Sequence, residues 1–153
     1  MIQYLTHNQI NLNKWDATVA ECGNIYAYSW YLDIVRPGWD ALVEDDYQSV
    51  MPLTGGKKFG VNYLFQPYFA QQLGVFSKQS LTPEKTEAFL KAIPSKYRFA
   101  EIRLNESNIL SERFEGIVSN LSHILRNGDV LQITAATEGR RIDFRHIISY
   151  FID

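Results

Sequence analysis

One segment of the chain, residues 26–72, combines many aromatic residues with the turn residues of a compact fold. It holds two of the three tryptophans and most of the nine tyrosines. Its pattern indicates a helix ended by Pro37-Gly38, then a strand, then a β-hairpin whose turn is Gly55-Gly56-Lys57-Lys58. Aromatic side chains at this density build either a sheet-and-helix core or a ligand-facing surface, and composition does not separate the two.

Strand and helix patterns also occur on both sides of this segment. Asn13 and Ser29 are the expected N-caps of two helices, and Thr82-Pro83 begins a third. The predicted strands are residues 2–5, 39–44, 48–54, 61–65, 99–104 and 129–135, and the predicted helices are residues 13–22, 29–35, 82–93 and 141–151. Residues 114–126 fit either a helix or a broken strand-turn. This order predicts an α/β (α+β) fold in which helices flank a sheet.

Length and composition predict one domain over residues 1–153. Hydrophobic residues make up 46% and charged residues 21%, which is typical of a globular protein. The net charge of −2 gives no basic excess, so non-specific binding to nucleic acid is not expected. The sequence has no signal-peptide pattern and no apolar run near the roughly 20 residues that span a bilayer. We therefore expect a cytoplasmic protein without a membrane span.

Motifs that hold metals or activate nucleophiles do not occur at recognised spacings. His7, His123 and His146 lie far apart and lack neighbouring ligands, so no metal site is predicted. The segment GGKKFG departs from the spacing of a phosphate-binding loop, which favours a solvated turn. Cys22 is the single cysteine, which excludes an intrachain disulfide, and it lies on the apolar side of its helix. This favours a buried small hydrophobe over a nucleophile.

Glu101 is the candidate catalytic residue. It lies in the middle of the strand at residues 99–104, on the face opposite Ala100 and Ile102. A pocket on that face would allow its carboxylate to act as a general base. An exposed sheet face, or a pair with Arg103, explains the same position, so both interpretations stay open.

A basic segment precedes the predicted terminal helix. Gly139, Arg140 and Arg141 are candidate cofactor-binding residues, because amides and arginines at a helix start can bind phosphate. The segment has one glycine, and a solvated amphipathic helix explains it more simply.

A cluster of aromatic and amide residues follows the hairpin and is the candidate ligand-binding surface. Such side chains suit a neutral, amino-sugar or peptide ligand better than a polyanion. Core aromatics with amides at a sheet edge are the alternative interpretation. The cluster consists of Tyr63, Gln66, Tyr68, Gln71 and Gln72.

Two stretches of the sequence resemble a known family. They are YAYSWYLDIVRPGWDALV and VMPLTGGKKFGVNYLFQPYFAQQLGVFS. Both are similar to the N-terminal half of FemAB-like proteins of the acyl-CoA N-acyltransferase (GNAT-like) superfamily, of the type common in Bacteroidetes. The resemblance covers residues 1–110, and residues 111–153 form a diverged or truncated tail.

The resemblance implies a GNAT-like fold with a mixed, mostly antiparallel sheet flanked by helices. Complete relatives carry two such domains and transfer aminoacyl groups from tRNA to cell-wall precursor peptides. An acyl-CoA or aminoacyl-tRNA donor is thus implied by resemblance only, and no cofactor is evident from the residues. In this fold pantetheine binds backbone groups where two parallel strands splay apart, and pyrophosphate binds amides at a helix N-terminus.

These observations lead to three hypotheses, of which the third is a small-molecule binding module unrelated to cell-wall chemistry. In the first, the chain is a GNAT-like domain that is not catalytically competent alone, and it is either a remnant or a module that binds a cell-wall precursor or a small amine or peptide ligand. In the second, it is an active N-acyltransferase whose site is completed by homodimerisation. The state of the strand splay distinguishes an enzyme from a remnant: an enzyme requires it open, and a remnant has it plugged by side chains such as the Ile and Phe residues of the tail.

Overall fold

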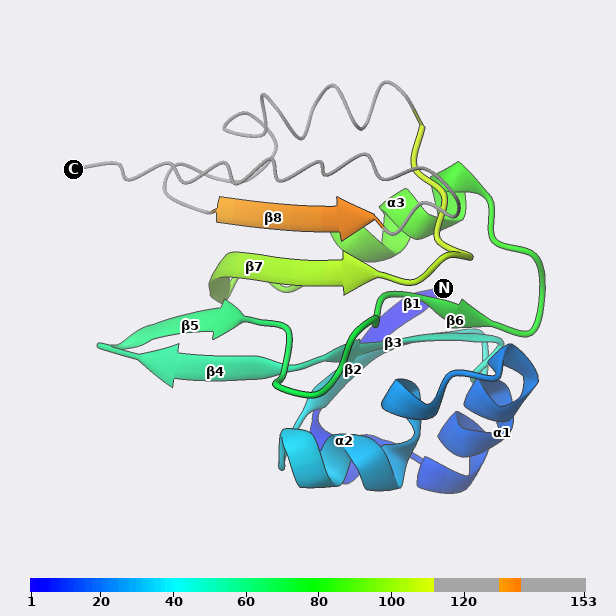
Figure 1. Ribbon diagram of the computed structural model, residues 1–153, viewed down its shortest axis with the longest axis horizontal. Helices are drawn as coiled ribbons and strands as arrows, with labels where there is room; N and C mark the ends of the chain where they lie inside the picture. The colour runs from blue at the N-terminus through cyan, green and yellow to red at the C-terminus, as the bar shows by residue number, and fades with distance from the viewer. Residues whose placement is uncertain (112–129, 136–153) are drawn as a thin grey trace.

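The computed structural model describes residues 1–111 and 130–135. Its helices and strands follow the predicted order, except for two short strands at Gly55–Lys58 and Phe76–Ser77 that were not predicted. Two short 3₁₀ turns at His7–Gln9 and Ile25–Ala27 precede α1 and α2 (Figure 1). The elements are β1 (Ile2–Leu5), α1 (Leu12–Cys22), α2 (Ser29–Val35), β2 (Asp40–Glu44), β3 (Ser49–Leu53), β4 (Gly55–Lys58), β5 (Val61–Leu64), β6 (Phe76–Ser77), α3 (Pro83–Lys91), β7 (Tyr97–Leu104) and β8 (Val130–Ala135). The predicted α+β class, with mostly antiparallel strands and flanking helices, is confirmed.

The strands form two sheets that share one long hairpin. The first sheet has the order β1-β2-β3-β6 and is antiparallel; the second has the order β4-β5-β7-β8, with β5, β7 and β8 parallel. Thr54 alone separates β3 from β4, and it bonds the opposite strand twice. Its carbonyl accepts from the Phe65 N–H at 3.2 Å, and its hydroxyl donates to the Phe65 carbonyl at 2.6 Å. The hairpin therefore runs through both sheets.

Seven residues leave the ladder of this hairpin. Val50 pairs with Phe76, whereas Gly55 pairs with Leu64. Five steps along one strand thus correspond to twelve along the other, so seven extra residues project from the second strand. We call this projection the 66–72 loop.

Two hydrophobic cores lie on opposite faces of the first sheet. Successive residues of β2 alternate between them, because side chains of a strand point to opposite faces. Ala41 and Val43 join the core under α1 and α2, where the rings of Trp15 and Trp39 lie 4.6 Å apart. Leu42 joins the core that contains Phe89 of α3.

Three local predictions were wrong, each for a reason of hydrogen bonding or backbone conformation. The N-cap of α1 is Asn11 rather than Asn13, because the Asn11 side chain accepts from the Lys14 N–H at 3.1 Å. Ser29 is the first residue of α2 and does not cap it; its hydroxyl donates to Asp16 at 2.7 Å.

The hairpin turn also differs from its predicted position. Gly55-Gly56-Lys57-Lys58 forms strand β4, and the turn is Phe59-Gly60, where both residues have positive φ (50° and 82°). A two-residue turn with both φ values positive matches the twist of the flanking strands. The glycines serve packing instead, since a Cβ at Gly55 would lie 2.6 Å from the Tyr97 ring.

A half-buried carboxylate ties the two sheets together. Asp40 of β2 accepts hydrogen bonds from Tyr4 of β1 at 2.5 Å and from Tyr97 of β7 at 3.0 Å. Lys96 Nζ lies 3.2 Å from the same oxygen and 4.6 and 4.8 Å from the rings of Tyr4 and Tyr97. Burial by itself raises the pKa of Asp40, but the hydrogen bonds from Tyr4, Lys96 and Tyr97 outweigh it and lower this pKa below its usual value.

Replacing Asp40 with asparagine is expected to destabilise the protein in a pH-dependent way. A carboxyl whose pKa is lowered on folding stabilises the protein above its unfolded pKa of about 3.9, and this contribution is lost as pH falls through the folded pKa. Asp40→Asn should lower the free energy of unfolding by about 2 kcal/mol at pH 7, and the difference from the parent should shrink below pH 4. Urea unfolding of the parent and the variant, at pH 7 and at a pH below 4, measures this difference in the free energy of unfolding. Asp46→Asn, at an exposed ion pair, is the control; an equal difference at both pH values would contradict the role of Asp40.

Candidate functional site

The candidate site begins where two parallel strand segments diverge. Leu73 bridges Leu104 at the end of β7: the Leu73 N–H donates to the Arg103 carbonyl at 2.8 Å, and the Asn105 N–H donates to the Leu73 carbonyl at 2.9 Å. Beyond this bridge the first segment continues into β6. The other chain segment turns at Asn105, whose carbonyl accepts from the Asn108 N–H at 3.0 Å. Such a divergence at the carboxyl ends of parallel strands is a common ligand position in sheet proteins.

Two buried asparagines fill this divergence. Asn105 Nδ2 donates to the carbonyls of Leu73 and Val75 at 2.9 and 3.1 Å. Asn108 bonds both polar groups of Val75: its Oδ1 accepts from the Val75 N–H and its Nδ2 donates to the Val75 carbonyl, each at 2.8 Å. A further bond of 2.8 Å joins the two asparagines. The backbone groups that the divergence exposes are therefore satisfied by side chains of the same chain.

Gly74 allows this close approach. A Cβ at this position would lie 2.7 Å from Asn108 Oδ1 and 2.8 Å from a Leu104 methyl group, and the φ of Gly74 is 93°. A side chain here would both strain the backbone and displace Asn108.

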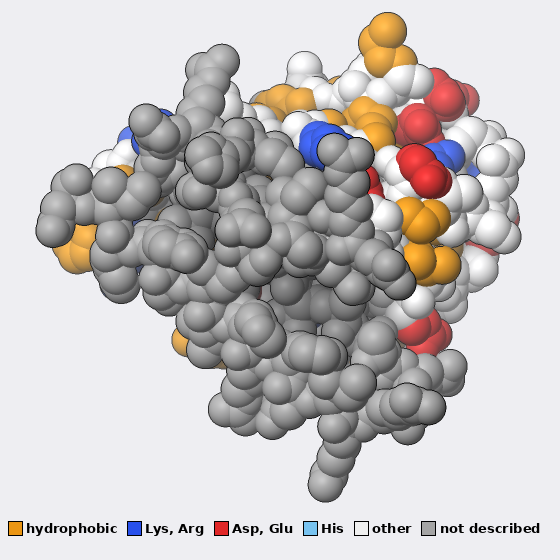
Figure 2. All heavy atoms as spheres, turned by 90° about the horizontal axis from the view of Figure 1, so that it is seen from above, with side chains coloured by type: hydrophobic (Ala, Val, Ile, Leu, Met, Phe, Trp, Pro, Cys, Tyr) orange, Lys and Arg blue, Asp and Glu red, His pale blue; other side chains and the backbone are white. Residues whose placement is uncertain are grey.

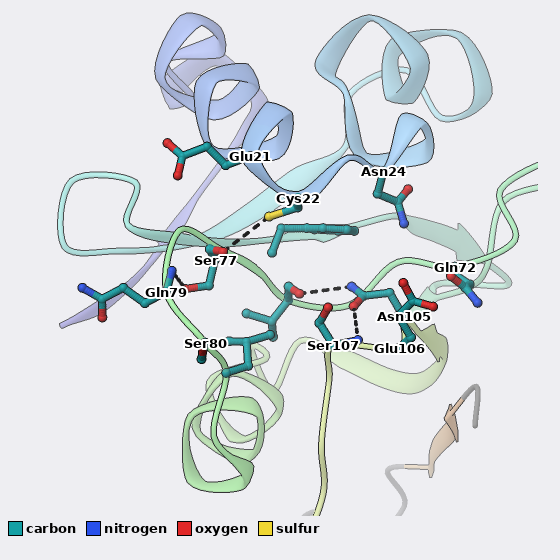
Figure 3. A pocket seen from close by; sticks show the side chains of 13 residues that line it. Glu21, Cys22, Asn24, Gln72, Ser77, Gln79, Ser80, Asn105, Glu106 and Ser107 are labelled. Atoms are coloured by element: carbon teal, nitrogen blue, oxygen red, sulfur yellow. Dashed lines mark hydrogen bonds between the residues drawn. The ribbon is translucent and has the colours of Figure 1, made fainter. Parts of the chain in front are cut away.

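A polar pocket of about 310 Å³ lies beside the asparagines (Figure 3). It is bounded by the C-terminal end of α1, the segment that ends in β6 with the loop after it, and the turn after β7. The lining residues are Glu21, Cys22, Asn24, Gln72, Val75, Phe76, Ser77, Gln79, Ser80, Leu81, Asn105, Glu106 and Ser107. The volume is at the lower end for small-molecule sites, which occupy roughly 300 to 1,000 Å³.

The lining favours neutral or cationic ligands. Carboxylates, amides and hydroxyls are its polar groups, and these described lining residues include no lysine or arginine. Carboxylates such as Glu21 and Glu106 repel phosphates and attract ammonium groups. The pocket therefore suits an amine, a sugar or a peptide rather than a nucleotide.

Cys22 contributes a thiol to this wall. Its Sγ lies 3.4 Å from the carbonyls of Thr18 and Ser77. Burial raises the pKa of the thiol, more than the hydrogen bond to Ser77 lowers it. Cys22 is half-buried rather than fully buried. A nucleophilic cysteine needs a lowered pKa, so the raised pKa of this thiol disfavours a nucleophilic role.

The N-terminus of α3, which follows the pocket in sequence, is occupied by its own cap. The Thr82 hydroxyl accepts from the Lys85 N–H at 3.3 Å, Pro83 has no N–H to offer, and Glu84 places a carboxylate in the first turn. These features satisfy the positive end of the helix dipole internally. An added anion would meet the charge of Glu84.

The predicted ligand-binding residues are spread over several positions, and of the five only Gln72 lines the pocket. Gln66 holds the 66–72 loop: its Nε2 donates to the Ala70 carbonyl at 2.8 Å and its Oε1 accepts from the Arg103 N–H at 3.2 Å. Tyr68 and Gln71 are exposed on that loop. Tyr63 lies on β5 with its ring 5.5 Å from that of Phe65.

The other predicted residues lie away from the pocket or outside the described part of the chain. Glu101 is half-buried on β7, paired in register with Gln132 of β8, and does not line the pocket. Its role as a general base stays a prediction. Gly139, Arg140 and Arg141 lie outside the described residues, as do residues 114–126 and 141–151.

The asparagine pair was not anticipated from the sequence. A sequence signal exists, since two asparagines three residues apart directly after a strand indicate a turn. Their amides, however, bond residues 30 to 33 positions earlier, which no local pattern reveals.

Comparisons with protein-family models, with curated proteins and with solved structures find no match to this chain. Over residues 1–111 and 130–135, no helix has the length and apolar character needed to cross a bilayer. On the face seen from the top of Figure 1, the described side chains of both charge signs are interspersed with hydrophobic ones (Figure 2).

Asn108→Ala is expected to destabilise the protein, because it leaves the buried N–H of Val75 without its side-chain acceptor and the Val75 carbonyl with Asn105 as its side-chain donor. The free energy of unfolding should fall by about 2 to 3 kcal/mol, measured by urea denaturation. Asn8→Ala, at an exposed position, is the matched control and should change stability by less than about 0.5 kcal/mol. Equal effects of the two substitutions would contradict the structural role of Asn108.

Proposed function

We propose that this chain is a GNAT-like domain, related to the first domain of FemAB-type transferases, that binds a ligand without transferring an acyl group on its own. The ligand class that fits the pocket is a small amine or peptide, such as the peptide portion of a cell-wall precursor. Three observations support this proposal: the family resemblance, the side chains that fill the strand divergence, and the polar pocket beside it.

The asparagine pair is the observation that carries this proposal. In the fold that the chain resembles, pantetheine binds the backbone where the parallel strands splay. In this chain, the corresponding groups of Leu73 and Val75 already bond Asn105 and Asn108. A pantetheine arm would have to displace four buried hydrogen bonds, each of which is costly to leave unmade.

Two features of the surroundings support the same proposal. The capped start of α3, with Pro83 and Glu84, disfavours a pyrophosphate. The acidic and amide groups of the pocket favour an ammonium or peptide group instead. Both features disfavour an acyl-CoA donor and leave room for an uncharged or cationic ligand.

A thermal-shift titration with acetyl-CoA and with a muropeptide precursor tests the proposal. A ligand at 100 times its Kd stabilises the folded state by about 2.7 kcal/mol, which raises the Tm of a domain of this size by roughly 5 to 10 °C. We expect this rise with the precursor and none with acetyl-CoA. A rise with acetyl-CoA would instead favour an N-acyltransferase completed by homodimerisation, and no rise with either ligand would contradict the binding role.

A substitution that fills the pocket should abolish the shift caused by the precursor. Ser80 is exposed at the pocket wall, so Ser80→Trp introduces a large side chain there without disturbing the core. Ser95→Trp places the same side chain on an exposed site that does not line the pocket. We expect Ser80→Trp to reduce the affinity at least tenfold, about 1.4 kcal/mol, and Ser95→Trp to leave it unchanged, as measured by isothermal titration calorimetry. Equal affinities of the two variants for the precursor would show that the precursor does not bind in this pocket.

A further inference from the structure

The outward side of α2 and the adjoining 66–72 loop expose four large apolar side chains. Trp30 and Ile34 on the helix are 51% and 72% exposed, and Tyr68 and Phe69 on the loop are each 86% exposed. We call these four residues the aromatic face. Large exposed apolar side chains that gather in one patch mark interaction sites more often than single ones do.

The two parts of the face are held together by Tyr31. Its hydroxyl donates to the Phe69 carbonyl at 2.7 Å, and its ring lies 5.6 Å from that of Trp30. Ile34 follows Trp30 by four residues and so lies beside it on the helix surface. Figure 1 shows the chain between β5 and β6 running toward α2, as this contact requires.

The loop presents its rings from a constrained backbone. Phe69 has a φ of 69°, a conformation that is costly for a bulky residue. The Ala70 N–H donates to the Pro67 carbonyl at 3.2 Å, and Gln66 donates to the Ala70 carbonyl, so hydrogen bonds on both sides maintain this turn. Strain that is held in place while an aromatic ring stays in solvent indicates a recognition surface.

Charge is absent from the loop side of this face. From Phe65 to Ser77 the chain contains no Asp, Glu, Lys or Arg. The cores of protein–protein interfaces have this composition, being rich in Tyr, Trp and Phe and poor in charged residues. A highly charged partner such as a nucleic acid would find no complementary groups on the loop.

We propose that the aromatic face binds the same face of a second copy of this chain, forming a twofold-symmetric dimer. The four side chains of the face are themselves uncharged and apolar, so they do not repel their copies in an isologous contact. With about 150 to 250 Å² for each fully exposed aromatic side chain, the four residues offer roughly 600 Å² per copy. Two copies then bury at most about 1,200 Å² through these four residues, which is the lower limit of specific interfaces.

Trp30 gives a direct readout of this contact. Trp15 and Trp39 are buried in the core, so acrylamide quenches the fluorescence of Trp30 selectively. We expect quenching to increase on dilution as Trp30 becomes exposed, while the mass from sedimentation equilibrium falls from twice 17.7 kDa to 17.7 kDa. A mass of 17.7 kDa and constant quenching at all concentrations would overturn the proposal.

Substitutions test whether the dimer uses this face. Phe69→Arg and Ile34→Glu each place a charge in the face and should weaken dimerisation at least tenfold without lowering the Tm of the monomer. Phe59→Arg is the matched control, because Phe59 is 93% exposed but lies at the tip of the β4–β5 hairpin, outside the face. A dimer that is unaffected by both face substitutions, or weakened equally by Phe59→Arg, would overturn the proposal. The dimer is independent of the proposed ligand, so the thermal-shift result does not decide it.

Discussion

The long hairpin, in which β3 and β4 pair with β6 and β5, is interrupted by the seven residues of the 66–72 loop. The rest of the structure depends on this one constraint. Where a strand leaves its ladder, buried backbone groups lose their partners and must find others. Side chains supply them at three points. Thr54 bonds Phe65 at the start of the interruption, Gln66 bonds the Arg103 N–H, and the asparagine pair bonds Leu73 and Val75 at its end. The candidate pocket and the aromatic face both border this interruption.

Asp40 contributes to the attachment of the two sheets to each other. The hairpin joins them on one side only, and Asp40 connects β1 and β2 to β7 through the hydroxyls of Tyr4 and Tyr97. The half-buried carboxylate is stabilised here because three donors surround it, with Lys96 as the third. The cluster holds one end of β7 in place, while the asparagine pair holds the other.

Apart from the short strands β4 and β6, the order and type of the described elements followed from sequence patterns, because they depend on local spacing and on turn residues. The alternation in β7 and the start of α3 at Thr82-Pro83 are the clearest cases. The candidate site was harder to predict. The sequence groups four residues with Gln72 because they are close along the chain. Their surroundings differ, because Tyr63 lies on β5 whereas Gln66, Tyr68 and Gln71 lie in the 66–72 loop. Asn105 and Asn108, which define the site, had no recognisable pattern beyond a turn.

The sequence by itself determined the α+β class, the amphipathic helices and the strands, since these depend on the period of apolar residues and on proline, glycine and capping residues. Only the tertiary structure decided that Gly55 and Gly56 pack against tyrosine rings, that Gln66 supports a loop, and that two asparagines fill the divergence between Leu73 and β7. Each of these roles joins residues far apart in the chain. Contacts of that kind depend on how the strands are placed in space, which the local pattern of a sequence does not specify.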